Sequence, residues 1–341
     1  MNQITSLTNT AESLRNRILK HNQRSIRLAS LLNTSQTTDI GRPIILDGYG
    51  RIHCFSELEK GDWITDPLPT IPASKRLKCN PELVRNARVL QLSACNLRCW
   101  YCFVDYDSLS PDSPSAKDYQ ISDIISSLTN NSTDPFVLDL SGGNPGLVPE
   151  WVWWTIKELQ DQDIENVYVW VDDNLTVNFY SKYLSQNQIR EIADYPRFGS
   201  VGCFKGFDDL SFSFNTGLVR ELFNEQFAVF KDLLSFGWDI YGYVTFTTDI
   251  QSNIRRRIAL FIDKLQDIDE NLPLRVIPLE IKPYTPTRMR MNYSRELAIK
   301  VQYEALNYWN EEIIKRFPSD LINQPICDIT YMSRGKSSGC S

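Results

Sequence analysis

Short runs of apolar and β-branched residues alternate along most of the chain with longer segments whose apolar residues recur at the spacing of an α-helix. The short runs begin near residues 89, 136, 166, 200, 238 and 273. Helical spacing is present in 117–129, 150–162, 180–193, 217–236, 252–268 and 293–316. Successive runs start roughly 30–47 residues apart, which is typical of β-strands joined by crossover helices.

This pattern predicts an α/β fold. Six consecutive strand–helix units with right-handed crossovers form a parallel sheet that curls into a partial (β/α)6, TIM-like barrel. In such sheets the chemistry lies at the carboxyl ends of the strands. Residues that directly follow a predicted strand are therefore the candidates for a functional site.

The two ends of the chain differ from this regular middle. Helical spacing in 11–32 predicts a helix, two apolar runs within 43–55 predict a β-hairpin, and the proline-rich stretch 66–74 indicates a linker. We expect an N-terminal helix and hairpin extension (1–85), a core (86–290), and a C-terminal helix with an irregular tail (291–341).

Composition and charge narrow the function class. Hydrophobic residues make up 42% of the 341 positions and charged ones 23%, as in packed globular proteins. The net charge of −6 argues against nucleic acid as a partner. No apolar run reaches the ~18 residues of a membrane span, and the first residues lack the apolar core of a signal peptide. We expect a cytoplasmic protein that does not enter membranes and whose thiols stay reduced.

Three of the eight cysteines stand close together in the segment CNLRCWYC. Cys95, Cys99 and Cys102 have the spacing C-x3-C-x2-C directly after the first core strand, so one loop can present three thiolates to a soft metal centre. Structural zinc sites and ferredoxin-type clusters use four protein ligands. A set of three leaves one position open for chemistry. The alternatives are three buried cysteines or a zinc loop completed from a distance.

This loop resembles that of the radical S-adenosylmethionine (radical SAM) superfamily, whose signature is CxxxCxΦC with an aromatic Φ, here Tyr101. The resemblance implies that Cys95, Cys99 and Cys102 hold a [4Fe–4S] cluster. It also implies that the open iron chelates the amino and carboxylate groups of S-adenosylmethionine (SAM). One electron then cleaves SAM to methionine and a 5′-deoxyadenosyl radical, which abstracts hydrogen from a substrate.

The second core strand ends in Gly142-Gly143-Asn144-Pro145, which resembles the superfamily's GGEP motif. Glycines allow backbone to approach a ligand closely, and the resemblance implies that this segment holds the methionyl amino group of SAM. Asn144 departs from the motif, because the family often has Glu there. An amide keeps an acceptor oxygen and loses the charge.

The ends of the third and fourth core strands resemble those of glycyl-radical-enzyme activating proteins within the superfamily. The residues concerned are Asp172, Asp173, Asn174 and Lys205. The resemblance implies that Asp173 or Asn174 faces the SAM ribose and that Lys205 faces the SAM carboxylate. Cys203 stands where those proteins carry Asp. The alternative is a solvated turn at 172–174 and a surface lysine.

Basic residues gather around the sixth strand: Lys282, Arg288 and Arg290 follow it, and Arg275 is expected inside it. At the carboxyl end they would place positive charge over the barrel mouth, suited to an anionic substrate or a peptide carboxylate. A solvated loop is the alternative interpretation.

The remaining cysteines give weaker signals. Cys327 and Cys340 lack the CxxC pairs of a second cluster domain, so we expect one cluster. A free thiol such as Cys203 or Cys327 could donate a hydrogen atom to a substrate radical.

We therefore expect a radical SAM enzyme that abstracts hydrogen from a peptide, a protein (including a glycyl-radical enzyme) or a metabolite. The family resemblance also implies a flavodoxin or ferredoxin-type reductant. The alternatives are a non-catalytic iron–sulfur or electron-transfer protein on the same barrel, and a zinc-stabilised adaptor.

Overall fold

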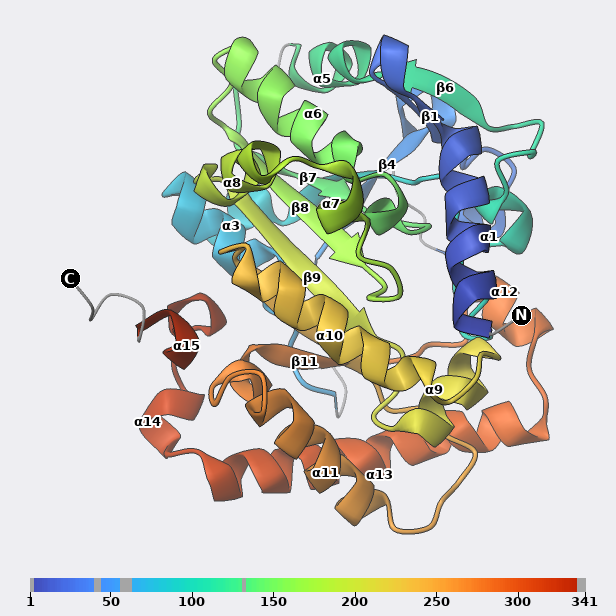
Figure 1. Ribbon diagram of the computed structural model, residues 1–341, viewed down its shortest axis with the longest axis vertical. Coiled ribbons are helices and arrows are strands. Elements are labelled where there is room, and N and C mark those ends of the chain that lie inside the picture. The colour runs from blue at the N-terminus through green and yellow to red at the C-terminus, as the bar shows by residue number, and fades with distance from the viewer. Residues whose placement is uncertain (1–2, 40–43, 56–62, 131–132, 336–341) are drawn as a thin grey trace.

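A computed structural model describes residues 3–39, 44–55, 63–130 and 133–335. Its centre is an eight-stranded sheet in the order β11-β10-β9-β8-β7-β5-β4-β3 (Figure 1). The strands are β3 (Ile44–Ile45), β4 (Gly50–Cys54), β5 (Asn86–Leu90), β7 (Phe136–Leu140), β8 (Val167–Asp173), β9 (Phe198–Phe204), β10 (Ile240–Thr245) and β11 (Val276–Leu279). A smaller sheet joins β1 (Leu19–Lys20), β2 (Ser25–Leu28) and β6 (Lys117–Gln120).

The predicted set of six parallel strands is confirmed. Strands β5 and β7 to β11 are adjacent, in chain order, and each pairs in parallel with its neighbour.

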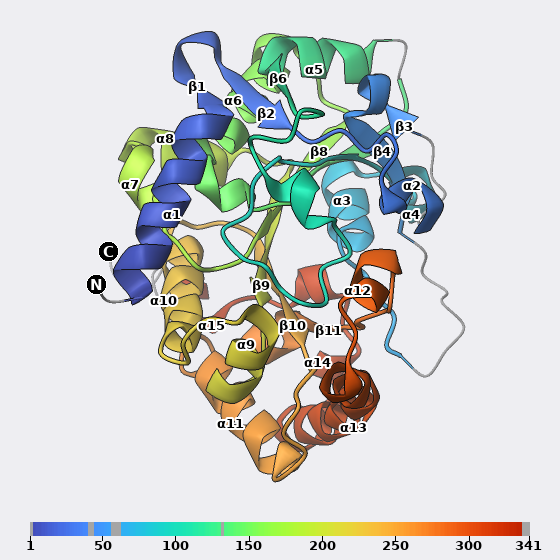
Figure 2. The same cartoon turned by 90° about the vertical axis from the view of Figure 1, so that its right-hand side faces the viewer.

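Helices cover the outside of the curved sheet, with α10, α11 and α13 beside β9 to β11 (Figures 1 and 2). The main helices are α1 (Gln3–Ile18), α3 (Thr70–Leu77), α5 (Ile121–Thr129), α6 (Pro149–Asp161), α7 (Phe179–Tyr183), α8 (Gln186–Asp194), α9 (Asp209–Thr216), α10 (Leu222–Ser235), α11 (Ile254–Gln266) and α13 (Tyr293–Arg316). The short ones are α2 (Ser35–Asp39), α4 (Pro81–Val84), α12 (Thr285–Met289), α14 (Ser319–Ile322) and α15 (Met332–Gly335).

Side chains alternate between two apolar clusters along these strands. One cluster joins the strands to the covering helices and includes Leu138, Leu140 and Val169. The other lies inside the curve of the sheet and includes Val137 and Trp170. We call the side that carries the second cluster the inner face. Because side chains alternate with period two, every second residue of each strand belongs to it.

The predicted helix over 11–32 is wrong beyond Ile18. There α1 ends, and the chain turns through Arg24, whose φ is 44°, into β2. Strand β2 pairs antiparallel with β6, and Ile26 and Leu28 are fully buried. Pairing with a strand about ninety residues away overrides the local helical spacing. For the same reason the predicted helix over 117–129 begins as β6 and becomes helical only at Ile121.

The predicted β-hairpin is confirmed for 44–54 and extends the main sheet. Strands β3 and β4 are antiparallel, and β4 pairs antiparallel with β5. Position 43 lies outside the described residues. The N-terminal extension thus supplies two strands to the edge of the core sheet.

The proline-rich stretch 66–74 is only partly a linker, because α3 begins at Thr70. Pro72 lies in the first helical turn, where a missing N–H costs no helical hydrogen bond. Before α3 the chain crosses the inner face. Trp63 Nε1 donates to the carbonyl of Pro278 on β11 at 2.9 Å, and Leu68 is buried in the inner cluster.

Other helical predictions differ in their boundaries. The segment 180–193 forms two helices, since Ser185 and Gln188 form a capping box that starts α8. The helix expected over 217–236 begins at Leu222, and that expected over 252–268 spans Ile254–Gln266. The long C-terminal helix is confirmed at 293–316, packed against α11. Among the described residues, none of the helices is long and apolar enough to span a bilayer.

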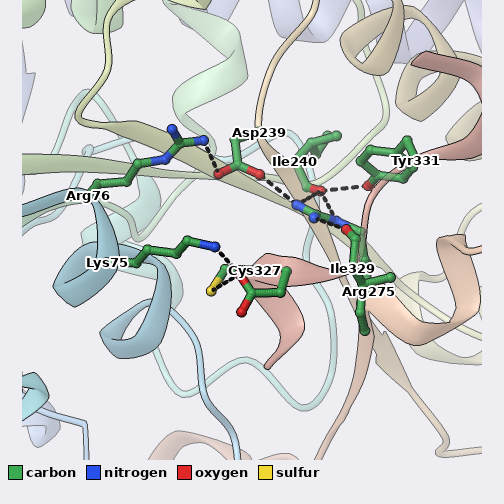
Figure 3. A network of polar contacts seen from close by, with 9 residues as sticks. Lys75, Arg76, Asp239, Ile240, Arg275, Cys327, Ile329 and Tyr331 are labelled. Atoms are coloured by element: carbon green, nitrogen blue, oxygen red, sulfur yellow. Dashed lines mark hydrogen bonds and ion pairs between the residues drawn. The ribbon is translucent and has the colours of Figure 1, made fainter. Parts of the chain in front are cut away.

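Arg275 does not lie within a strand or at the mouth of the barrel. It ends a 3-10 turn (Leu272–Arg275) before β11, so it lies at the amino ends of the strands. Its guanidinium donates to Asp239 at 2.6 Å and to the Ile329 carbonyl at 2.6 Å, while Tyr331 donates to the Ile240 carbonyl (Figure 3). These hydrogen bonds hold the C-terminal segment around Ile329 and Tyr331 against the amino-terminal end of the barrel.

We predict that Arg275→Ala lowers the free energy of unfolding by about 3–5 kcal/mol, because it leaves Asp239 without its buried partner. Arg76, which contacts the other oxygen of Asp239 with a half-exposed side chain, is the matched control. Arg76→Ala is expected to cost about 1 kcal/mol or less. Equilibrium urea unfolding measures both. Equal losses would contradict the structural role of Arg275.

Candidate functional site

The predicted site residues follow four adjacent strands. The cysteine loop follows β5, Gly142 to Pro145 follow β7, Asp173 ends β8 with Asn174 next, and Lys205 follows β9. Since these strands are parallel neighbours, their carboxyl ends meet at one edge of the sheet. The structure thus brings together residues that span more than a hundred positions of the sequence.

The backbone of the cysteine loop is fixed from outside. Asn215 in α9 binds Trp100 twice, through its carbonyl to the backbone N at 3.2 Å and through Oδ1 to the indole N at 3.0 Å. Thr287 Oγ1 donates to the Tyr101 carbonyl at 3.0 Å. Arg290 donates to the Cys102 carbonyl at 2.6 Å. The loop conformation is therefore set by contacts that do not use the thiols.

The basic residues that follow the sixth strand, β11, bind protein groups nearby. Arg290 is engaged by carbonyls of the cysteine loop. Lys282 lies 3.6 Å from Glu280, and Arg288 lies 3.8 Å from Asp39. Each of the three is held by a local protein partner. The expectation of a basic cluster over the barrel mouth is therefore wrong for Arg275 and is not supported for the other three.

Cys99 is buried, whereas Cys95 and Cys102 are partly exposed. Desolvation raises the pKa of Cys95 and Cys102, and it raises that of Cys99 to about 12, although the Lys205 ammonium opposes the shift. Burial alone would lower the pKa of Lys205, but Cys203, Cys99 and Cys95 raise it overall. Thiolates are the ligating species, so a bound metal centre would have to stabilise them against this desolvation.

The donor set fits an iron–sulfur cluster. Thiols are the ligands that such clusters take, and all three stand on one loop beside the Lys205 ammonium. In a cubane cluster each cysteine binds a different iron, so the thiols need not converge on a single ion. Within the described ranges, no three His, Cys, Asp or Glu side chains converge on one ion.

Gly142 and Gly143 pack against the segment that leads into the cysteine loop. Their φ angles are +77° and +70°. A Cβ on Gly143 would lie 2.3 Å from the Ala94 carbonyl oxygen, and Asn144 N donates to that oxygen at 2.8 Å. The glycines therefore allow the backbones that follow β5 and β7 to touch.

Three asparagines connect these strand ends. Asn144 and Asn174 both donate through Nδ2 to Asn96 Oδ1, at 3.1 and 2.9 Å, and Asn174 Nδ2 lies 3.8 Å from Cys95 Sγ. Asn144 is 1% exposed. A Glu at 144 would have no N–H to donate to Asn96.

The two aspartates that end β8 point to opposite faces. Asp172 is on the inner face and accepts from Ser141 Oγ at 2.6 Å. Asp173 is on the outer face, where its Oδ1 accepts from Leu175 N at 2.6 Å and burial raises its pKa to about 7. A Cβ on Gly146 would lie 2.2 Å from the other oxygen of Asp173.

The alternative of a solvated turn at 172–174 is therefore wrong, because Asp173 and Asn174 are buried. Asn174, beside Cys95, is better placed than Asp173 to meet a ligand bound at the cysteine loop. Lys205 lies on the inner face and is partly exposed, with its backbone N bound by Gln226.

Two buried amides at the site, Gln226 and Asn215, were not among the predicted site residues. Gln226 in α10 donates to the carbonyls of Asn174 and Cys203 and accepts from Lys205 N, each at 3.2 Å, so it joins the ends of β8 and β9. Asn215 joins the cysteine loop to the Lys205 carbonyl at 2.8 Å. Gln226 falls within a regular helical pattern, and only its apolar neighbourhood distinguishes it.

No protein-family model matches the chain, and no curated protein matches it. Solved structures similar to it include Streptococcus suis SuiB bound to the precursor peptide SuiA (14% identity, TM-score 0.44), which it matches over 67% of its own length and 46% of that chain. Native anSMEcpe with bound AdoMet (16%, TM-score 0.43) matches over 65% and 60% of the two chains. A spore photoproduct lyase variant (10%, TM-score 0.42) matches over 69% and 75%.

This chain thus spans about half of the SuiB chain and three fifths of the anSMEcpe chain. Because the TM-scores are below 0.5 and the identities are low, the residue roles and substrates of these proteins are not assigned to this chain.

We predict that Gly143→Ala destabilises the protein more than Gly217→Ala. Both glycines have positive φ, which costs alanine about 1–2 kcal/mol. Only Gly143 would also place a Cβ against backbone, since nothing lies within 4 Å of one at Gly217. Overpacking adds about 1–3 kcal/mol. Urea unfolding of the two variants measures the difference, and equal losses would mean that the backbones do not meet as described.

Proposed function

We propose that the protein is a radical SAM enzyme. In this proposal Cys95, Cys99 and Cys102 hold a [4Fe–4S] cluster with one iron open to SAM. The observation that carries it is the three-cysteine loop at the carboxyl end of β5, in backbone contact with the Gly142–Gly143 segment. The neighbouring strand ends supply the polar groups that a molecule with ammonium, carboxylate and hydroxyl groups requires.

When bound and reduced, the cluster supplies the electron that cleaves SAM to methionine and the 5′-deoxyadenosyl radical. The chain's own residues bind and orient SAM. Backbone groups of Gly142 to Pro145 accept from the methionyl amino group, and Asn174 meets the ribose hydroxyls. Lys205 donates to the carboxylate. Tyr101 lies between the ligating cysteines and packs edge-on against Trp100 at 5.7 Å, which orients its ring.

Of Asp173 and Asn174, we assign the contact with the SAM ribose to Asn174. Asp173 is directed outward and is 4% exposed, with one oxygen already bound by Leu175 N. Its role in this proposal is to fix the turn after β8, so that Asn174 is presented beside Cys95.

The substrate proposed is a peptide, a protein or a small molecule that reaches the inner face of the barrel, and the reductant is a flavodoxin or ferredoxin-type protein. We also propose that residues 1–85 and 286–341, which lie outside the part that resembles the superfamily, select the substrate. Residues 63–69 support this role because they lie across the inner face beside β10 and β11.

Cys99→Ala is expected to abolish SAM cleavage and to lower the iron content of anaerobically reconstituted protein, because one of three cluster ligands is lost. Cys79→Ala is the matched control, since Cys79 is partly buried outside the loop. Iron analysis and chromatography of 5′-deoxyadenosine after dithionite reduction measure both effects.

Three outcomes would contradict the proposal. They are a colourless protein with one zinc per chain, an iron–sulfur protein that does not bind SAM in isothermal titration, and a Cys99→Ala variant that still forms 5′-deoxyadenosine.

A further inference from the structure

The inner face of the barrel carries carboxyl groups that the proposed chemistry does not use. Asp139 and Asp172 lie on neighbouring strands, β7 and β8, and both belong to the inner face by alternation from Val137 and Trp170. A third carboxyl, Asp66, comes from the segment that crosses this face and accepts from Tyr243 of β10 at 2.7 Å. Three separate parts of the chain therefore direct acids into one region.

This region is open to water toward the carboxyl ends of the strands. Asp172, Cys203 and Tyr243 point inward and are still partly exposed. Below them, Tyr168, Trp170, Val201 and Tyr241 are buried and close the barrel. Solvent therefore reaches Asp172 from the carboxyl ends of the strands, and the buried side chains close the opposite end.

Asp139 lies deepest, and one of its oxygens has no partner. The residue is 6% exposed, and its Oδ1 has no hydrogen-bond partner among the described residues. A buried carboxyl oxygen without a donor is unfavourable, and a bound group that donates to it would remove that cost. Asp139 differs in this respect from Asp66 and Asp172, whose carboxyl groups accept hydrogen bonds from Tyr243 and Ser141.

Two cations of this face act on the carboxyl groups. The charges of Lys205 and Arg51 lower the pKa of Asp172, and that of Arg51 lowers the pKa of Asp139. Under the proposed function Lys205 is engaged by the SAM carboxylate. Burial opposes these charges and raises the pKa of Asp139 and Asp172, and it raises that of Asp66 to about 6.

We propose that Asp139, Asp172 and Asp66 form a subsite on the inner face that binds a protonated amine or guanidinium group of the substrate. The inference rests on the proposed function, because it places the group beneath SAM, within the barrel where hydrogen abstraction would occur. A basic side chain of the substrate supplies donors for Asp139 Oδ1, and its positive charge favours the ionised form of the carboxyl groups.

The test compares amino acids that differ only in this group, added to reconstituted protein with SAM and followed by saturation-transfer NMR. L-Lysine is paired with L-norleucine, and L-arginine with L-citrulline. At least one cationic member should bind, and its neutral partner should not. Asp139→Asn should weaken that binding about tenfold or more without lowering the melting temperature, since it replaces a buried acid by an amide of the same shape. Asp161→Asn, an exposed acid on α6, is the control and should change neither.

Binding of neutral and cationic members with equal affinity, an Asp139→Asn variant that binds as the wild type does, or binding of none of the four probes would each overturn the subsite. Formation of 5′-deoxyadenosine is measured on the same samples. Cleavage of SAM without cation binding overturns the subsite alone, whereas cation binding without cleavage overturns the proposed function alone.

Discussion

The site depends on the desolvation of three thiols at the end of β5. Burial raises the pKa of Cys95, Cys99 and Cys102, so the free thiolates are unfavourable where they stand. Lys205 offsets part of this cost from the end of β9. A metal centre that binds thiolates would supply the rest, which couples the charge state of the loop to ligation.

Neutral amides, together with Arg290, hold the surroundings of these thiols in place. Asn96, Asn144 and Asn174 form one network, and Asn215 and Gln226 join the cysteine loop, β8 and β9 from the helices behind. An amide donates and accepts without adding charge, so it can be buried at little cost once both functions are satisfied. Asn144 is therefore a coherent part of this site.

The sequence was informative where signals were local or periodic. The spacing of the apolar runs predicted the six parallel strands. One short motif, C-x3-C-x2-C, predicted the position of the cysteine loop. The strand at Ser25–Leu28 could not be predicted, because its partner β6 is remote in the sequence. Arg275 was misplaced because the 3-10 turn before β11 continues the apolar pattern of the strand. Asp139 did leave a signal, as the one charged residue in the apolar run FVLDL, and only the alternation of faces gave it meaning.

Mössbauer spectroscopy of oxygen-free, iron-reconstituted protein, recorded with and without SAM, tests the central claim most directly. The account predicts a cubane cluster in which a single iron changes its signal when SAM is added, because three thiolates leave that iron to an external ligand. A cluster whose irons are all insensitive to SAM, or the absence of a cubane cluster, would contradict it.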